Sequence, residues 1–135
     1  MNRAIISPAR LCGSVTVPPS KSAAHRAIFC AALARGESRL YHVADSEDMR
    51  ATLGAIQAMG VEVRREGDAL IVNSSGKWED EAEIDCGESG STLRFLIPIL
   101  AALGISAELT GRGRLPYRPL NTYCLLYTSP SPRDA

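Results

Sequence analysis

Hydroxyl and cationic side chains are grouped at the start of a predicted helix. Ser20 is a suitable N-terminal cap for a helix that runs to about Ala34. Lys21 lies in its first turn, and Ser22 and Arg26 are four residues apart, so they share a helix face. A helix N-terminus beside cations binds anions, and phosphate accepts many charged hydrogen bonds. The pattern predicts a phosphate site, with a capped helix and solvated basic residues as the simpler alternative.

A second helix start and a later loop offer further anion-binding groups. Residues 87–92 read Gly-Glu-Ser-Gly-Ser-Thr, and small residues let a backbone approach an anion closely. Arg94 follows on the next turn, and a loop rich in Gly and Pro carries Arg112, Arg114 and Arg118. The segment 87–92 matches neither a nucleophile elbow nor a P-loop. Taken alone, these groups are better explained by a plain helix cap and a solvated surface turn.

The remaining titratable residues suggest no metal centre. His25 and His42 have no third ligand near them in the sequence, so we interpret both as structural histidines. We interpret Asp45, Glu47 and Asp48 as acids at a helix start, where their negative charge interacts favourably with the helix dipole. The four cysteines form no Cys-x-x-Cys pair.

Hydrophobic periodicity predicts alternating strands and helices. The third helix is apolar on nearly every side and contains Pro98, so we expect it to be buried and kinked. Residues 4–17 are expected to form two short extended pieces. The predicted helices are 20–34, 46–60 and 91–104, and the predicted strands are 40–43, 61–63, 69–72, 84–86 and 105–109.

Two segments of the chain are weakly similar to each other. In each, serines precede an arginine by three to six residues, an apolar helix follows, and a glycine stands ten residues after the arginine. The pairs are Arg26 with Gly36 and Arg94 with Gly104. Such a repeat is typical of an α/β architecture built from similar units.

The composition of the chain is that of an ordinary globular protein. Hydrophobic residues make up 45% and charged residues 22%, as in globular domains, and the net charge of zero favours neither nucleic acid nor membrane partners. Among the fifteen basic residues only Lys21 and Lys77 are lysines. The excess of arginine suits bidentate binding of phosphate or carboxylate, and coding bias explains it equally well. Without a secretory signal or a long apolar run, free thiols in the cytoplasm are expected.

Four motifs together resemble the 5-enolpyruvylshikimate-3-phosphate synthase family. In chain order they are Pro-Ser-Lys-Ser-Ala-Ala-His-Arg at 19–26, Asp-Ser-Glu-Asp at 45–48, Asp-Cys-Gly-Glu-Ser-Gly-Ser-Thr-Leu-Arg at 85–94 and Leu-Pro-Tyr-Arg-Pro at 115–119. The sister UDP-N-acetylglucosamine enolpyruvyl transferase shares the fold but differs in the first motif. The resemblance covers about residues 3–120.

The resemblance implies a fold, a reaction and a set of site residues. The fold is α/β, with repeated βαβαββ units of the inside-out α/β barrel of enolpyruvyl transferases, incomplete in this chain. The reaction transfers the enolpyruvyl group of phosphoenolpyruvate to shikimate 3-phosphate without a metal or cofactor, in a full-length protein expected to be a monomer. Lys21 is implied to be catalytic and to contact both substrates. Motif positions assign Ser22 and Arg26 to shikimate 3-phosphate, Gly90 and Arg118 to phosphoenolpyruvate, and Arg94 and Asp48 to the vicinity of the site.

The chain departs from the family pattern in two places. Glu88 stands where some members carry Asn, and its carboxylate has to point away from a bound anion. Residues 121–135 show no helical stripe and contain a Ser-Pro repeat. We therefore expect a partial enolpyruvyl transferase domain over 1–120 and a non-native or disordered tail over 121–135, in a fragment without activity of its own. A stand-alone phosphometabolite-binding module and a poorly folded product are the alternatives.

Overall fold

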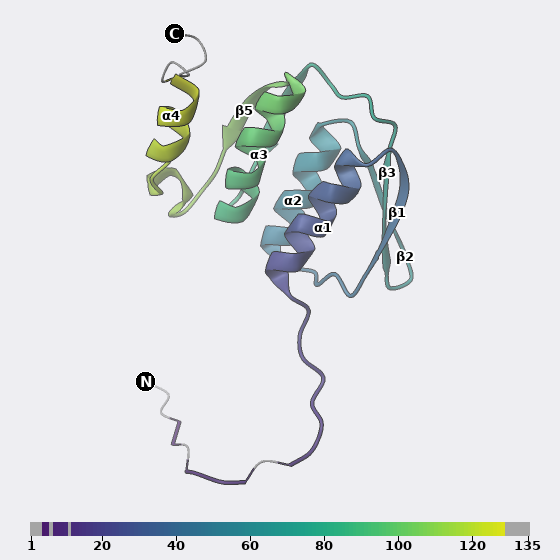
Figure 1. Ribbon diagram of the computed structural model, residues 1–135, viewed down its shortest axis with the longest axis vertical. Helices are drawn as coiled ribbons and strands as arrows, with labels where there is room; N and C mark the ends of the chain where they lie inside the picture. The colour runs from purple at the N-terminus through teal and green to yellow at the C-terminus, as the bar shows by residue number, and fades with distance from the viewer. Residues whose placement is uncertain (1–3, 6, 11, 129–135) are drawn as a thin grey trace.

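The computed structural model describes residues 4–5, 7–10 and 12–128 (Figure 1). The elements are α1 (Lys21–Leu33), β1 (Gly36–Tyr41), α2 (Glu47–Ala58), β2 (Glu62–Glu66), β3 (Ala69–Ser74), β4 (Glu81–Asp85), α3 (Gly90–Leu103), β5 (Ser106–Thr110), the 3-10 helix η1 (Leu115–Tyr117) and α4 (Asn121–Thr128). From α1 to β5 the helices and strands follow the order that the sequence predicts, with three successive strands between the second and third helices.

The strands form two separate sheets. β1, β3 and β2, in that spatial order, form an antiparallel sheet, whereas β4 and β5 form a parallel pair around the crossover helix α3. The turn predicted at Glu66-Gly67-Asp68 joins β2 to β3, with Gly67 in the left-handed region at φ +61°. Figure 1 shows α1 and α2 side by side over the antiparallel sheet, with α3 on their other side.

Serine side chains begin all three long helices, as predicted for the first two. Ser20, Ser46 and Ser89 cap α1, α2 and α3, and each hydroxyl accepts from the backbone N–H three residues later, at 3.3, 3.4 and 3.3 Å. Gly104 ends α3 in the left-handed conformation, with φ +74°. The three helices run in the same direction, so that their N-termini lie at one end of the molecule (Figure 1).

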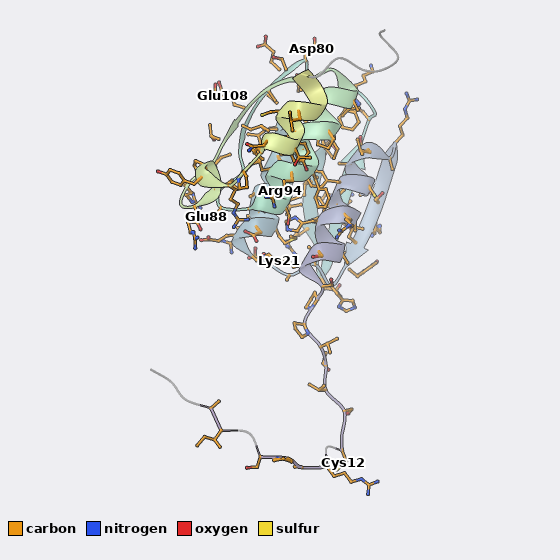
Figure 2. The ribbon with its side chains drawn as sticks, turned by 60° about the vertical axis from the view of Figure 1, so that its left-hand side comes forward. Cys12, Lys21, Asp80, Glu88, Arg94 and Glu108 are labelled. Carbon is orange, nitrogen blue, oxygen red and sulfur yellow. The ribbon has the colours of Figure 1, made fainter. Side chains whose placement is uncertain are left out.

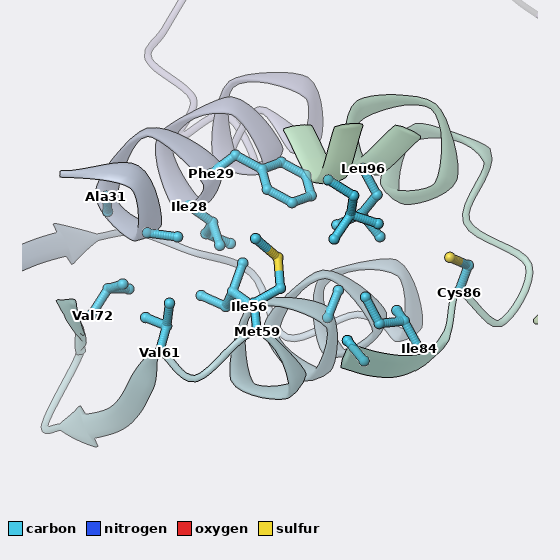
Figure 3. Close-up of a cluster of buried hydrophobic side chains, with 14 of the residues drawn as sticks. Ile28, Phe29, Ala31, Ile56, Met59, Val61, Val72, Ile84, Cys86 and Leu96 are labelled. Atoms are coloured by element: carbon cyan, nitrogen blue, oxygen red, sulfur yellow. The ribbon is translucent and has the colours of Figure 1, made fainter. Parts of the chain in front are cut away.

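The core lies between the three helices and the antiparallel sheet. Figure 3 shows the side chains that meet in this space: Ile28 and Phe29 of α1, Ile56 of α2, Met59 at the C-terminal cap of α2, and Leu96 of α3. None of them is more than 4% exposed. Burial of one such side chain stabilises a fold by about 1.5–3 kcal/mol, so this cluster fixes the three helices against one another.

The central strand β3 is buried on both faces. Leu70 and Val72 face the helices as part of the core, and neither is exposed. Ile71 alternates to the outer face and is also fully buried. Its register partners on β1 and β2 are Arg39 and Arg64, whose long aliphatic stems can cover apolar surface.

The expectation that α3 is buried is met only in part. The helix continues through Pro98 to Leu103, and buried positions form one face rather than all sides. Leu93, Leu96 and Leu100 are buried, whereas Phe95, Ile97 and Ile99 are half-buried. The expectation of full burial was wrong because α1, α2 and the β4–β5 sheet cover only one side of α3.

The structure also differs from the sequence prediction at both ends. Residues 121–128 form the helix α4, where we expected no helix; it begins after Pro119, and Tyr123 Oη donates to the carbonyl of Arg94 at 3.2 Å. The rest of the expected tail, 129–135, lies outside the described residues. In the described part of 4–19 no strand forms, and Val15 and Val17 are 85% and 74% exposed. Local β propensity is not enough there, because no neighbouring strand is available for pairing.

Candidate anion site at the helix N-termini

The first turn of α1 carries a cation that is paired with α2. Lys21 Nζ forms an ion pair with the carboxylate of Asp48, in the first turn of α2. The Lys21 side chain remains 56% exposed, so its charge is accessible from solvent. The structure thus brings together two of the residues predicted from separate motifs.

A second cation of α1 is held against α3. Arg26 Nη1 donates to the carbonyl of Ser22 at 2.8 Å, which places the two residues side by side as the helical spacing predicts. The guanidinium carbon lies 5.3 Å from the centroid of the Phe95 ring, within the range of a cation–π contact. Phe95 in turn packs edge-on against Phe29, with ring centroids 5.9 Å apart. The orientation of Arg26 therefore depends on the packing of α1 against α3.

The start of α3 and the residue after η1 meet at Gly90. A Cβ atom at Gly90 would overlap Nη1 of Arg118, so the guanidinium lies directly on the glycine. The backbone N–H of Arg118 donates to the carbonyl of Leu115 at 3.0 Å, which anchors the residue to η1. A side chain at position 90 would displace the Arg118 guanidinium from this contact.

Glu88 is directed toward the arginine-rich loop. Its carboxylate lies against the Cα of Gly113, where any Cβ would overlap it, and Gly113 has a φ of +60°. The loop is fixed nearby by the N–H of Arg112, which donates to the carbonyl of Gly87 at 2.8 Å. Since Arg118 rather than Glu88 covers Gly90, the carboxylate is turned away from the two residues that the family resemblance assigns to phosphoenolpyruvate.

These residues share one end of the molecule. Figure 2 shows Lys21 and Glu88 at the end where the helices begin, and Asp80 and Glu108 at the opposite end. Arg94 lies one turn further along α3, on its exposed face. A hollow of about 280 Å³ opens beside the start of α2, and its lining includes Glu47, Arg50, Asp85, Gly87, Glu88 and Arg112.

Beneath this surface, a chain of hydrogen bonds joins the three helices. His25 Nδ1 lies 2.8 Å from Thr52 Oγ1, which lies 2.8 Å from Thr92 Oγ1, and that hydroxyl lies 2.7 Å from Ser89 Oγ. Thr52 Oγ1 also donates to the carbonyl of Asp48 at 3.0 Å. None of the four linked residues is more than 2% exposed.

The interpretation of His25 as a structural histidine is confirmed, but its partners were not foreseen. Thr52 lies 27 residues after His25, and Thr92 lies 40 residues after Thr52, so no local sequence pattern connects them. Burial lowers the pKa of His25 below its ordinary value of 6.5, with Lys21 and Arg26 acting in the same direction and Asp48 opposing them. His25 is therefore neutral at physiological pH.

Other chemistry finds little support in the described part of the chain. Among these residues no group of three or more His, Cys, Asp or Glu side chains is placed to hold a metal ion. None of the described helices is long and apolar enough to cross a membrane. Burial, with a smaller contribution from Asp85, raises the pKa of the Cys86 thiol to about 11, so this cysteine is not a thiolate nucleophile at neutral pH.

Comparison with known proteins gives a consistent result. Residues 5–124 match the family described as EPSP synthase (3-phosphoshikimate 1-carboxyvinyltransferase). The chain is 47% identical over 125 residues to a 3-phosphoshikimate 1-carboxyvinyltransferase of Clostridium perfringens, an alignment that covers 91% of the chain and 30% of that protein. The corresponding protein of Clostridium kluyveri is 43% identical, with 92% and 29% covered.

A solved structure supports the fold. The EPSP synthase of Acinetobacter baumannii superposes with a TM-score of 0.68 and 29% sequence identity, over 81% of this chain and 25% of that one. The chain thus spans about 30% of the length of the curated relatives that it matches. The fold is that of the enolpyruvyl transferases, present in part. From the family match, the identities and the superposition, the chain belongs to the EPSP synthase family.

Proposed function

We propose that this chain supplies anion-binding groups to an enzyme that transfers the enolpyruvyl group of phosphoenolpyruvate to shikimate 3-phosphate. The observation that carries the proposal is the meeting of residues from all four family motifs at one end of the molecule. Lys21 and Asp48 are joined there by an ion pair, and Arg118 lies on Gly90. We further propose that the whole protein acts as a cytoplasmic monomer.

Electrostatics gives each cation a role in this proposal. Both substrates are anions, so holding them side by side requires positive charge that offsets their repulsion. Lys21 is assigned to both substrates, because it is exposed at the first turn of α1 and a carboxylate already orients its ammonium group. Ser22 and Arg26 are assigned to shikimate 3-phosphate, and Arg118 to phosphoenolpyruvate.

Gly90 is proposed to keep the phosphoenolpyruvate position open. Its missing side chain allows the Arg118 guanidinium and a bound anion to approach the first backbone N–H groups of α3. Asp48 positions Lys21, and Arg94 adds positive charge along the same helix. Proton transfer in the addition and elimination steps is assigned to the part of the relatives that this chain does not cover.

A chimera tests the proposal. Residues 5–124 would replace the matching segment of the Clostridium perfringens relative, and phosphate release would be followed with both substrates present. We expect transferase activity, and we expect Lys21→Ala to lower kcat/KM for both substrates. Loss of a charged contact worth about 2–4 kcal/mol corresponds to a decrease of about 30- to 1,000-fold.

Two controls make the outcome specific. Lys77→Ala removes the other lysine of the chain, in the loop before β4, and is expected to leave kcat/KM unchanged. The 135-residue chain alone is expected to show no turnover, since it spans about 30% of its relatives. A folded chimera without activity, or a Lys21→Ala effect below threefold, would contradict the proposed function.

A further inference from the structure

The direction of one buried hydrogen bond follows from the number of protons available. Thr52 Oγ1 has three close partners, namely His25 Nδ1, Thr92 Oγ1 and the carbonyl oxygen of Asp48. The carbonyl can only accept, and Thr92 Oγ1 donates its own proton to Ser89 Oγ, so the single hydroxyl proton of Thr52 is shared between Asp48 and Thr92. His25 Nδ1 has no proton left to accept from Thr52 and has to donate one itself.

This proton count fixes the form of the imidazole ring. His25 is neutral, because it is buried and lies close to Lys21 and Arg26. A neutral ring carries one N–H, which is therefore on Nδ1. The hydroxyl of Thr52 selects the Nδ1–H form, whereas a histidine in water prefers the Nε2–H form.

The hydrogen-bonded residues stand next to the proposed binding groups. His25 precedes Arg26 on α1, Thr52 lies one turn after Asp48 on α2, and Ser89 caps α3 immediately before Gly90. A shift of one helix along its axis would break a buried bond and leave a polar group without a partner, which is costly. The chain of bonds therefore resists relative movement of the three N-termini.

We infer that His25, Thr52, Thr92 and Ser89 form a positioning network, in which a neutral Nδ1–H imidazole holds the anion-binding ends of the three helices in one fixed arrangement. The tautomer follows from the hydrogen-bond geometry together with the burial that keeps His25 neutral, whereas the anion-positioning role rests on the proposed function. Since all four side chains are buried, they act through Lys21, Arg26 and Gly90 rather than by contact with a substrate.

Nitrogen-15 NMR of the histidine side chains tests the tautomer in the 135-residue chain. The sequence has two histidines, and the exposed His42 provides a reference signal in the same spectrum. We expect His25 to show a protonated Nδ1 and an unprotonated Nε2. Thr52→Val, which removes the hydroxyl at nearly constant volume, is expected to abolish this preference, and Thr52→Ser to retain it.

Titration with inorganic phosphate tests the positioning role in the same samples. Thr52→Val is expected to weaken phosphate binding about fivefold, equivalent to one hydrogen bond of about 1 kcal/mol. Thr52→Ser should bind as the parent does. Thr110→Val is the matched control, because it removes a hydroxyl that donates to the carbonyl of Ile84 within the β4–β5 sheet. It is expected to change neither measurement.

A further variant separates the two parts of the inference. Thr92→Val leaves the His25–Thr52 bond in place but cuts the connection to α3, so it should keep the Nδ1–H signal and still weaken phosphate binding. It also serves if Thr52→Val fails to fold. An Nε2–H signal in the parent chain would overturn the network. Unchanged phosphate binding in both valine variants would overturn its positioning role, whereas a parent chain that binds no phosphate would overturn the proposed function.

Discussion

The two halves of the chain bury their sheets to different extents. The N-terminal half, residues 21–74, places its central strand β3 between two strands and beneath two helices, and five of the six β3 residues are buried. In the C-terminal half, residues 81–128, the strand β5 has one neighbour, and four of its five residues are exposed. Both halves contain a serine-capped helix followed by a strand, so the difference lies in what covers the strands.

The N-terminal half therefore covers its own sheet, whereas the sheet of the C-terminal half is left partly uncovered. Parallel sheets are normally covered on both faces, yet the β4–β5 pair exposes Glu81, Glu83 and Glu108 around an open hollow of about 470 Å³. The relatives are more than three times as long as the matched segment. The N-terminal half thus provides the rigid support of the anion site, and α3 joins the site through its N-terminal turn and its contacts with α1 and α2.

The largest expected effect is on stability, and it compares one leucine from each half. Leu70→Ala on β3 removes a fully buried side chain and should lower the free energy of unfolding by about 2–5 kcal/mol. Leu109→Ala on β5 removes a half-buried one, and a loss of less than about 1 kcal/mol is expected. Urea denaturation of both variants measures the difference. Equal losses would show that the two halves are packed alike.

Two glycine substitutions, one in α3 and one in α2, test whether ligand binding depends on the absence of a side chain at the start of α3. Gly90→Ala places a methyl group on the guanidinium of Arg118, and phosphoenolpyruvate binding is expected to weaken about tenfold, or about 1.4 kcal/mol. Gly54→Ala on α2 meets no atom within 4 Å and is expected to bind normally, with a helix stabilised by about 0.5–1 kcal/mol. Calorimetric titration compares them, and equal affinities would contradict the assignment of Gly90.

The smallest effect concerns the outer face of the antiparallel sheet. Hydrogen bonds from Arg64, at 2.7 Å, and from Arg39 hold the pKa of Glu37 below its usual 4.5. A lowered carboxyl pKa adds stability above pH 4.5, and that stability is lost as the pH falls through the folded-state value. The parent chain should therefore lose more stability on acidification than Glu37→Gln does. The difference should be small and should shrink with salt, since these side chains are exposed. If the stability of the two chains changes with pH in the same way, these ion pairs contribute nothing measurable to stability.

Local signals in the sequence predicted most of the secondary structure. Ser20 and Ser46 were predicted as helix starts because a cap acts over three residues, and Gly67 and Gly104 mark turns and ends for an equally local reason. The cap at Ser89 was not predicted, since the third helix was expected to begin at residue 91. The helix α4 was missed because we judged its residues by apolar periodicity. Burial of α3 was overestimated, since composition does not say how many sides of a helix have neighbours.

Only those residues of the candidate site that belong to the family motifs could be predicted from the sequence. The resemblance brought Lys21, Gly90 and Arg118 into one hypothesis, and their roles stay predictions. The bond between His25 and Thr52 and the contact of Arg26 with Phe95 depend on how α1, α2 and α3 pack, which no local pattern encodes. Long-range side-chain networks of this kind become visible only in the folded chain.

The most direct test of the anion site is an NMR titration of the nitrogen-15-labelled chain with phosphoenolpyruvate. We predict that backbone amide signals of residues 21–26 and 89–94, together with that of Arg118, shift with one dissociation constant. Signals of the β4–β5 sheet are predicted to remain unchanged, and Lys21→Ala is predicted to weaken the binding. An absence of shifts at residues 21–26 and 89–94, or shifts confined to the β4–β5 sheet, would contradict the placement of the site at the helix N-termini.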